Sequence, residues 1–140
     1  ELAMKEGSYL VKPNIGELSV LAGRDEMDII EIELVAKEIV SKGKCEIMVV
    51  SMGNTGAMLI TKNEVYKVAA PIVKKKSTVG AGDSMVAGIV LSLSRGNSLK
   101  ESLEFGVACG TAATMNMGTE LCKYEDVKKL LNLIRAVPSN

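Results

Sequence analysis

Apolar positions follow two spacings along the 140-residue chain, and each spacing indicates a different kind of element. Residues 15–22 and 28–43 carry apolar side chains at helical intervals, so that each segment has one apolar face. Residues 46–51 are instead nearly continuous in hydrophobicity and rich in β-branched residues, which is typical of a strand covered on both faces. The pattern therefore predicts two helices ahead of a central strand in an α/β fold.

The rest of the chain continues this mixture of elements. A short apolar run at 9–11 predicts a strand, which Pro13 ends and which leads to Asn14 as the cap of the next helix. Two strand-like segments lie on either side of three polar residues that suit a hairpin turn, so part of the sheet is expected to be antiparallel. The strand-like segments are 57–61 and 65–69, and further helices are expected after the loop 77–83 to about Arg95, over 99–117 and around 127–134.

Local signals mark the starts of two helices and the packing of one of them. Asp28 with Glu31, and Ser98 with Glu101, have the three-residue spacing of a capping box. The segment 99–117 is rich in alanine, glycine and methionine, and its glycines are expected to let neighbouring backbones approach. This helix is therefore expected to be buried.

Charge and composition exclude several classes of protein. Seventeen acidic residues balance 17 basic ones, and one short basic run, 74–76, is far from the wide positive face of a nucleic-acid-binding protein. No apolar run is long enough for a membrane span and no signal peptide opens the chain, so we expect a cytoplasmic protein without membrane association. Cys45, Cys109 and Cys122 are odd in number and lack CxxC spacing, which favours reduced thiols.

The chain contains no histidine. Serine–histidine triads, HExxH metalloprotease sites and histidine proton shuttles are therefore excluded within these 140 residues. Any general base in this chain must be a carboxylate, a lysine, a tyrosine or a cysteine.

The segment with the clearest chemistry is the glycine-rich run 77–84, which precedes a helical pattern. Gly80 and Gly82 allow unusual backbone angles and bring amides close to a ligand, while the start of a helix offers unpaired N–H groups and a partial positive charge. The amides of Gly80, Ala81, Gly82 and Asp83 are therefore predicted to form an anion hole that stabilises a transferring phosphoryl group.

Asp83 lies where a carboxylate would be held ionised by the helix terminus and could accept a proton from an attacking hydroxyl. Two other glycine-rich phosphate-binding motifs are excluded because residues that they require are absent. A Walker A loop needs Gly-Lys-Ser/Thr, and a dinucleotide fingerprint needs glycine where Met85 stands. From these residues alone, a tight turn with Asp83 as a simple helix cap is the alternative interpretation.

The run Gly80-Ala81-Gly82-Asp83 resembles the second signature of the ribokinase-like carbohydrate kinase family. More narrowly, three segments are similar to the phosphofructokinase branch of that family, which includes the minor bacterial 6-phosphofructokinase isozyme, and the likeness spans essentially the whole chain. These segments are 11–18, the turn 51–57 and the stretch 112–119.

The resemblance implies a three-layer α/β/α ribokinase-like fold, of which this chain is the C-terminal half, and a kinase that uses ATP and Mg²⁺ with K⁺ as a further ion. It implies that Asp83 is the catalytic base and that Glu17 acts on Mg²⁺ through water, although Glu17 also reads as an ordinary first-turn residue. The implied ATP contacts are Lys12, Asn14, Ser51, Gly53, Gly56, Val107 and Thr111, and the implied monovalent-cation residues are Ser77, Val79, Ala113, Asn116 and Gly118.

One departure from the branch concerns the outer edge of the cation site, where Glu120 stands in place of an expected arginine. The basic run 74–76 either assists phosphates or is a solvated surface, and the second interpretation is favoured.

The resemblance also implies that residues 1–140 are the nucleotide-binding and catalytic part of a kinase domain whose N-terminal half and lid are absent here. An unpaired apolar sheet edge would then favour a homodimer or another self-association. Three functions remain open: phosphorylation of fructose 6-phosphate, which is favoured; phosphorylation of fructose 1-phosphate or tagatose 6-phosphate; and a non-catalytic nucleotide-binding or assembly module.

Overall fold

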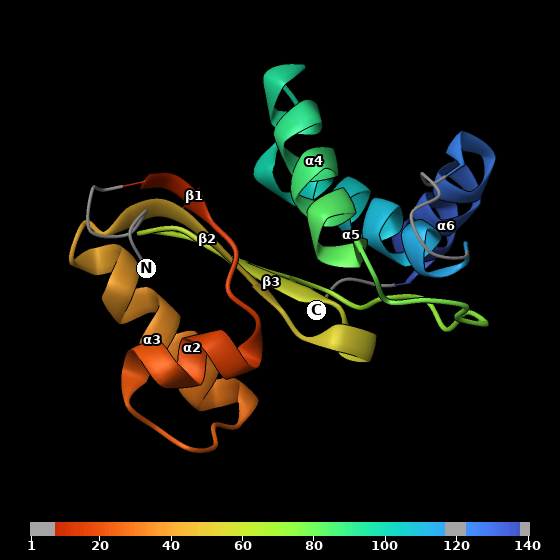
Figure 1. Ribbon diagram of the computed structural model, residues 1–140. Coiled ribbons are helices and arrows are strands. Elements are labelled where there is room, and N and C mark those ends of the chain that lie inside the picture. Colours follow the sequence, from red (N-terminus) through yellow and green to blue (C-terminus); the bar gives the residue numbers. More distant parts are fainter. Residues whose placement is uncertain (1–7, 117–122, 138–140) are drawn as a thin grey trace. The chain divides into compact units, whose positions relative to one another are not determined.

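A computed structural model describes residues 8–116 and 123–137 of the chain (Figure 1). The described residues divide into two compact units. Unit 1 holds residues 8–53 and 57–67, and unit 2 holds residues 54–56, 68–116 and 123–137.

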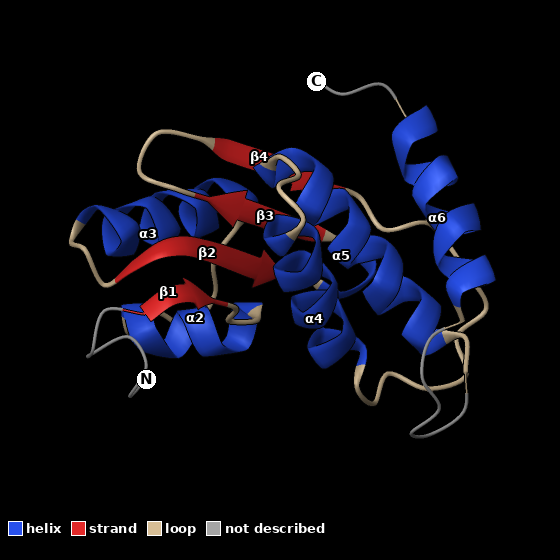
Figure 2. Ribbon diagram, turned by 90° about the horizontal axis from the view of Figure 1, so that it is seen from above, coloured by secondary structure: helices blue, strands red, loops and turns tan. Residues whose placement is uncertain are grey.

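A four-stranded mixed sheet is the framework of unit 1 (Figure 2). Its first two strands are parallel, with Leu10 opposite Ile47, and the second and third are antiparallel, with Met48 opposite Ile60. Part of the sheet is therefore antiparallel, as predicted, with the antiparallel register between the second and third strands, while the two strands of the predicted hairpin are neighbours in the sheet. In spatial order, the strands are β1 (Ser8–Val11), β2 (Cys45–Ser51), β3 (Ala57–Ile60) and β4 (Val65–Val68), whose last residue belongs to unit 2.

Two helices, α2 (Ile15–Ala22) and α3 (Ile29–Ser41), lie together on one face of this sheet (Figure 1). Their apolar faces meet the sheet in a single core, in which Leu18, Ala36 and Met48 are essentially inaccessible to solvent. Burying a side chain as large as leucine or methionine contributes about 1.5–3 kcal/mol. The helical spacing of apolar residues therefore marked the faces that hold unit 1 together.

Unit 2 is built on three helices, α4 (Ala81–Ser94), α5 (Leu99–Thr114) and α6 (Tyr124–Ala136). Helices α4 and α5 lie side by side (Figures 1 and 2), and α5 is buried along most of its length, as its composition predicted. The apolar stripe of α6 is also buried, and Arg135 Nε lies 3.4 Å from Glu104 Oε1 on α5.

Two helix boundaries differ from those expected. Helix α4 begins at Ala81, inside the segment predicted to be a loop, because Gly80 adopts a left-handed conformation (φ 79°) and turns the chain directly into the helix. Helix α5 ends at Thr114 and not at residue 117, because three-residue bonds from Met115 N to Ala112 O (3.1 Å) and from Asn116 N to Ala113 O (3.4 Å) close its last turn.

Asn14 caps α2 as predicted, and of the two predicted capping boxes the one at α5 is complete and the one at α3 is half formed. At α5, Ser98 and Glu101 cap each other's backbone at 3.1 and 3.2 Å. At α3, the Asp28 side chain accepts a bond from Glu31 N at 2.8 Å, but the Glu31 carboxylate pairs with Arg24 at 2.9 Å and does not complete the box.

Two further expectations concern thiols and membranes. Cys45 and Cys109 are buried and form no disulfide within the described part of the chain, as expected, while Cys122 lies outside the described residues. Within residues 8–116 and 123–137, no helix has the length and apolar character needed to cross a bilayer.

Candidate functional site

The turn that opens α4 brings together the residues predicted to handle a phosphoryl group. Gly80 is the N-cap residue and provides no side-chain hydrogen bond to the amides that follow, which are Ala81, Gly82 and Asp83 in the first helical turn. The first N–H groups of a helix lack helical partners and carry part of the positive end of the helix dipole. Gly80 is exposed and Gly82 is half-buried, so a small anion has access to this turn.

Asp83 is the third residue of α4, and its side chain is exposed. A carboxylate in this position is stabilised by roughly 0.3–1 kcal/mol by the helix terminus. The two findings that would have contradicted a kinase, an Asp83 buried in an apolar interior or glycines within a strand, are not what the structure shows. The proposed base and the proposed amide donors thus lie on one helical turn.

The loop ahead of this turn is attached to the end of α5. Lys76 N and Ser77 N both donate to Thr114 O, at 2.7 and 3.1 Å, and Val79 N donates to Ser77 Oγ at 3.1 Å. The attachment places Ser77 and Val79 close to the turn that contains Ala113 and Asn116. Four residues predicted for the monovalent cation are therefore neighbours in unit 2.

The chemistry of this region fits a hard monovalent cation, which takes oxygen ligands such as main-chain carbonyls. Ala113 O already accepts Asn116 N at 3.4 Å, a long bond that leaves a carbonyl lone pair for another partner. Asn116 itself is buried. The fifth predicted residue, Gly118, lies outside the described residues, as does Glu120.

Val107 and Thr111, the two implied ATP contacts that the family resemblance places near the adenine, lie one turn apart on α5. Their exposed fractions are only 3% and 8%. An adenine ring in contact with them would therefore meet small parts of each side chain, and this contact stays a prediction.

In unit 1, the predicted residues gather where the parallel strands β1 and β2 end. Asn14 forms a parallel bridge with Ser51, and Ser51 N donates to Pro13 O at 3.1 Å. Lys12, half-buried, directly precedes this point. Ligands of open α/β sheets commonly bind at the carboxyl ends of the strands, so the position of Lys12, Asn14 and Ser51 suits a binding role.

Asn14 and Glu17 are also joined to each other. Asn14 Oδ1 accepts a bond from Glu17 N at 2.7 Å, and Glu17 Oε1 accepts one from Asn14 N at 2.9 Å. This capping box starts α2, so Asn14 and Glu17, which the family resemblance connects with ATP and Mg²⁺, also have a structural role here. Among the described residues, Glu17 belongs to no cluster of three or more acidic, cysteine or histidine side chains able to hold a metal.

The turn after β2 contains the last two predicted residues, Gly53 in unit 1 and Gly56 in unit 2. In unit 2, a Cβ atom added to Gly56 (φ 105°) would lie 2.0 Å from Val68 O, so the backbones of residues 56 and 68–70 are in close contact. Lys75 Nζ donates to Asn54 Oδ1 in the same turn.

The bond between Lys75 and Asn54 is not among the features that the sequence predicts, and the basic run is expected to be a solvated surface. Twenty-one residues separate the two side chains, so no local spacing could have revealed the bond. The exposure of residues 74–76 agrees with the solvated interpretation, while the bond gives one of the three lysines a specific partner.

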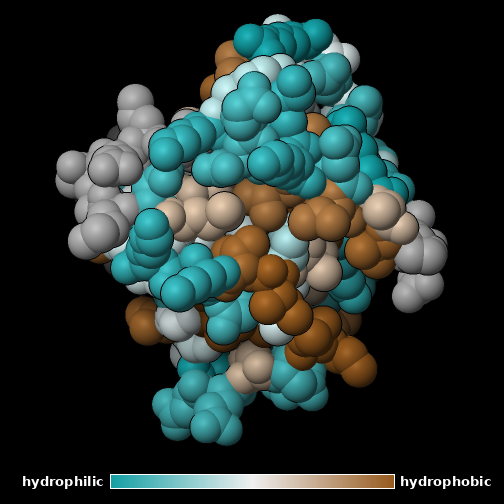
Figure 3. All heavy atoms as spheres, turned by 90° about the vertical axis from the view of Figure 1, so that its right-hand side faces the viewer, coloured by the Kyte–Doolittle hydropathy of each residue, from teal (hydrophilic) through white to brown (hydrophobic). Residues whose placement is uncertain are grey.

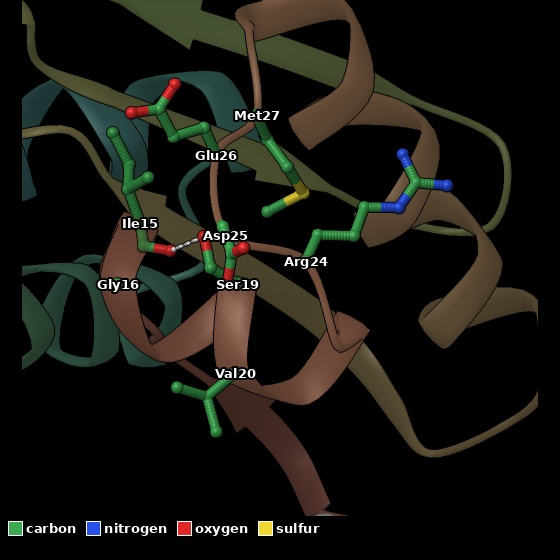
Figure 4. Close-up of a pocket in the computed structure, with 8 residues that line it drawn as sticks. All are labelled: Ile15, Gly16, Ser19, Val20, Arg24, Asp25, Glu26 and Met27. Carbon is green, nitrogen blue, oxygen red and sulfur yellow. Dashed lines mark hydrogen bonds between the residues drawn. The ribbon is translucent and has the colours of Figure 1, made fainter.

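A separate hollow in unit 1 holds none of the predicted site residues (Figure 4). The Ser19 hydroxyl in it donates to Ile15 O at 2.9 Å, and Arg24 is paired with Glu31. The Ser19 and Arg24 side chains are therefore already used within the fold. The hollow is lined by Ile15, Gly16, Ser19, Val20, Arg24, Asp25, Glu26 and Met27.

Comparison with known families gives a match over most of the chain. Residues 2–126 match the model of the family described as pfkB family carbohydrate kinases. Among curated proteins, the chain is 46% identical over 121 residues to the ATP-dependent 6-phosphofructokinase isozyme 2 of Escherichia coli strain K12, and 40% identical over 128 residues to the 1-phosphofructokinase of Borreliella burgdorferi. These alignments cover 86% and 91% of this chain but 39% and 41% of the relatives, so the chain spans about two fifths of their length.

Solved structures agree with the sequence comparison. The structure of the Escherichia coli phosphofructokinase-2 in complex with substrates and products is similar with a TM-score of 0.90 and 43% identity, over 95% of this chain and 43% of that one. A structure of the same enzyme in complex with potassium has a TM-score of 0.89, 42% identity and coverage of 96% and 44%. The Arabidopsis thaliana ribokinase complexed with ribose and ATP has a TM-score of 0.79, 25% identity and coverage of 88% and 40%. The α/β fold with its mixed sheet is therefore ribokinase-like.

Proposed function

Because this chain belongs to the pfkB family of carbohydrate kinases, we propose that it forms the nucleotide-binding and catalytic part of an enzyme that phosphorylates a phosphosugar with ATP. The observation that supports this proposal most directly is the α4 turn, where the helix-start amides of Gly82 and Asp83 lie beside the exposed carboxylate of Asp83, while the Ala81 N–H also donates to Thr78 O at 3.3 Å. The N-terminal half of the kinase domain and its lid are proposed to lie outside these 140 residues.

The proposed reaction assigns one role to each part of the turn. A hydroxyl oxygen of the phosphosugar attacks the γ-phosphorus of ATP while the bond from that phosphorus to the β–γ bridging oxygen breaks, and the hydroxyl proton passes to the Asp83 carboxylate. The amides of residues 80–83 stabilise the charge on the equatorial oxygens of the phosphoryl group, and losing one such donor costs about 2.7–4 kcal/mol in well-studied enzymes.

The remaining predicted residues would hold the nucleotide and its ions. We propose that Lys12, Asn14 and Ser51, which meet at the ends of β1 and β2, contact ATP together with Gly53, Gly56, Val107 and Thr111. Bound Mg²⁺ would neutralise phosphate charge, with Glu17 acting on it through water. The loop 77–79 and the turn 113–116 would hold K⁺, a proposal supported by their attachment through Thr114 O.

Fructose 6-phosphate is the favoured acceptor because the relative with 46% identity is a 6-phosphofructokinase. Fructose 1-phosphate is the main alternative, because 1-phosphofructokinases match the chain at 40% and 37% identity, and tagatose 6-phosphate remains a third candidate. Turnover of an enzyme that contains this chain, measured with each sugar in turn, separates these proposals.

Self-association is proposed because β1 and β4 are the outer strands of the described sheet, and open strand edges tend to pair with other chains. Large apolar side chains are also exposed, and Figure 3 shows apolar groups gathered at the surface between hydrophilic ones. Light scattering of the 140-residue chain at micromolar concentration is expected to give at least the mass of a dimer. The mass of a monomer would contradict this proposal.

The test of the proposed function is Asp83→Asn. The substitution keeps the shape of the side chain but removes the proton acceptor, so turnover is expected to fall about 10²–10⁴-fold while the dissociation constant for ATP, measured by calorimetry, stays unchanged. Asp126→Asn is a matched control, because Asp126 is likewise the third residue of a helix and lies on α6.

Equal turnover in the Asp83→Asn and unsubstituted enzymes would overturn the proposed role of Asp83. The alternative, a non-catalytic module, would be favoured by a different result. In that case the unsubstituted chain would bind ATP but would neither hydrolyse it nor phosphorylate any of the three sugars, even when combined with the remaining part of the domain.

A further inference from the structure

Helix α5 passes directly beneath the first turn of α4 at Gly110. A Cβ atom added to Gly110 would lie 3.1 Å from Ala81 O and 3.2 Å from Met85 Cβ. Contacts this short are tighter than nine in ten observed Cβ contacts, so any larger residue at position 110 would displace its neighbours by a few tenths of an ångström. The Ala81 carbonyl is the nearest of those neighbours.

The position of Ala81 O matters because of peptide planarity. The carbonyl of Ala81 and the N–H of Gly82 belong to the same rigid peptide unit, so a displacement of the oxygen tilts the N–H as well. The Gly82 N–H is one of the donors proposed to contact the phosphoryl group. A side chain at position 110 that displaces Ala81 O would therefore also reorient the Gly82 N–H, because both belong to one peptide plane.

Helix α5 also fixes the chain just ahead of this turn. One helical turn beyond Gly110, Thr114 O accepts the N–H groups of Lys76 and Ser77 at 2.7 and 3.1 Å. The loop that enters the phosphate-binding turn and the first peptides of that turn therefore both rest on the last third of α5. Because both are held by the same rigid helix, their relative position does not depend on the flexibility of the loop.

We propose that Gly110 is a positioning residue for phosphoryl transfer: the absence of a side chain at this position sets the tilt of the Ala81–Gly82 peptide and so the direction of the Gly82 N–H. The functional part of this inference rests on the proposed kinase function. The structural part concerns only the contact between α5 and α4.

The test compares Gly110→Ala with two substitutions at the same helix pair. A Cβ atom at Gly106 would lie 2.3 Å from Ile89 Cγ1 and 2.9 Å from Met85 O, and one at Gly88 would lie 2.9 Å from Cys109 Sγ. Gly106→Ala and Gly88→Ala therefore crowd the same interface without touching the Ala81–Gly82 peptide. All three variants are expected to lower the melting temperature.

Only Gly110→Ala is expected to change the chemistry of the folded protein. Since a misplacement of about 1 Å can cost 10²-fold in rate, a shift of a few tenths of an ångström is expected to lower kcat roughly three- to tenfold, with little change in KM for the sugar. In the ¹⁵N-labelled chain, the Gly82 amide signal of Gly110→Ala is expected to shift in the absence of ligand and to respond more weakly to added inorganic phosphate or MgATP.

Two results would overturn the inference: a Gly82 signal and phosphate response that match those of the unsubstituted chain, or equal losses of kcat in all three variants. If the unsubstituted chain itself shows no response to MgATP, the proposed function fails, whereas the ligand-free Gly82 shift still tests the contact. Should Gly110→Ala unfold, the same measurements are made in a stabilising osmolyte, which favours the folded state without altering the contact.

Discussion

Asn14 and Glu17 cap each other's backbone, with bonds of 2.7 Å from Glu17 N to Asn14 Oδ1 and 2.9 Å from Asn14 N to Glu17 Oε1. The pair that the family resemblance connects with Mg²⁺ and phosphate is thus also the pair that starts α2. A substitution that removes either side chain changes the stability of the helix as well as any binding of Mg²⁺ or phosphate. Separating the capping role from the binding role therefore needs variants that change only one of them.

Glu17→Gln is expected to separate them, because glutamine also completes a capping box but carries no charge. Unfolding stability is expected to change by less than about 0.5 kcal/mol, while the Mg²⁺ concentration needed for half-maximal turnover rises. Glu17→Ala, the comparison variant, is expected to lose about 1 kcal/mol of stability as well. If Glu17→Gln leaves the Mg²⁺ dependence unchanged, Glu17 is only a cap.

Gly56→Ala is expected to destabilise the protein strongly. The new Cβ atom would lie 2.0 Å from Val68 O, and residue 56 has a positive φ of 105°. Backbone strain of about 1–2 kcal/mol and overpacking of about 1–3 kcal/mol together predict a loss of about 2–5 kcal/mol in denaturant unfolding.

Gly43→Ala is the control for this measurement, because Gly43 also has a positive φ (74°) but no atom within 4 Å of the added Cβ. It is expected to show the strain component alone. Similar losses for the two variants would mean that the contact between residues 56 and 68 relaxes at little cost.

Lys75→Met is expected to weaken ATP binding if the turn around Asn54 contacts the nucleotide, because the variant removes the bond to Asn54 Oδ1. Both side chains are exposed, so the effect should be small, about two- to fivefold in the dissociation constant, in line with about 0.2–1 kcal/mol for exposed polar pairs. Asn54→Ala and the double variant complete a double-mutant cycle, with Lys74→Met as the control. Additive effects in the cycle would show that the bond has no role in binding.

Glu33 is expected to make stability depend on pH. Its carboxylate lies 2.9 Å from Lys67 Nζ and 3.3 Å from Lys37 Nζ. The hydrogen bond from Lys67 is the main reason that the pKa of Glu33 is lowered, and the bond from Lys37 adds to it, while partial desolvation opposes both. Because the pKa is lower in the folded state, the pair stabilises the protein above the ordinary glutamate pKa of about 4.3, and this stabilisation is lost as the pH falls through the folded-state value.

Urea unfolding of Glu33→Gln is therefore expected to show a deficit of less than about 1 kcal/mol at neutral pH, which disappears in acid. The size is limited because the Lys67 side chain is 52% exposed. Glu38→Gln, which alters an exposed pair with Lys42 on the same helix, is the control. A deficit that persists at the lowest pH would show that packing, and not charge, is responsible.

The sequence determined most of the local structure of this protein and its family. Helical spacing identified α2, α3 and α6, the nearly continuous apolar run identified β2, and the Gly-Ala-Gly-Asp run identified the carbohydrate kinase family. These features depend on neighbours within a few residues, whose side chains share a face or a turn whatever the rest of the chain does. The Asp28 cap shows the limit of such rules, because Glu31 pairs with Arg24 instead of completing the box.

Only the tertiary structure decided which residues from distant parts of the sequence are in contact. The bond between Lys75 and Asn54, the pairing of Glu33 with Lys67 and the passage of Gly110 under Ala81 join positions 21 or more residues apart. Sequence showed that Gly110 would allow a close approach, but not which atom approaches it. Such pairs are set by how whole helices and strands pack, and packing depends on the shape of the entire core, which no local spacing encodes.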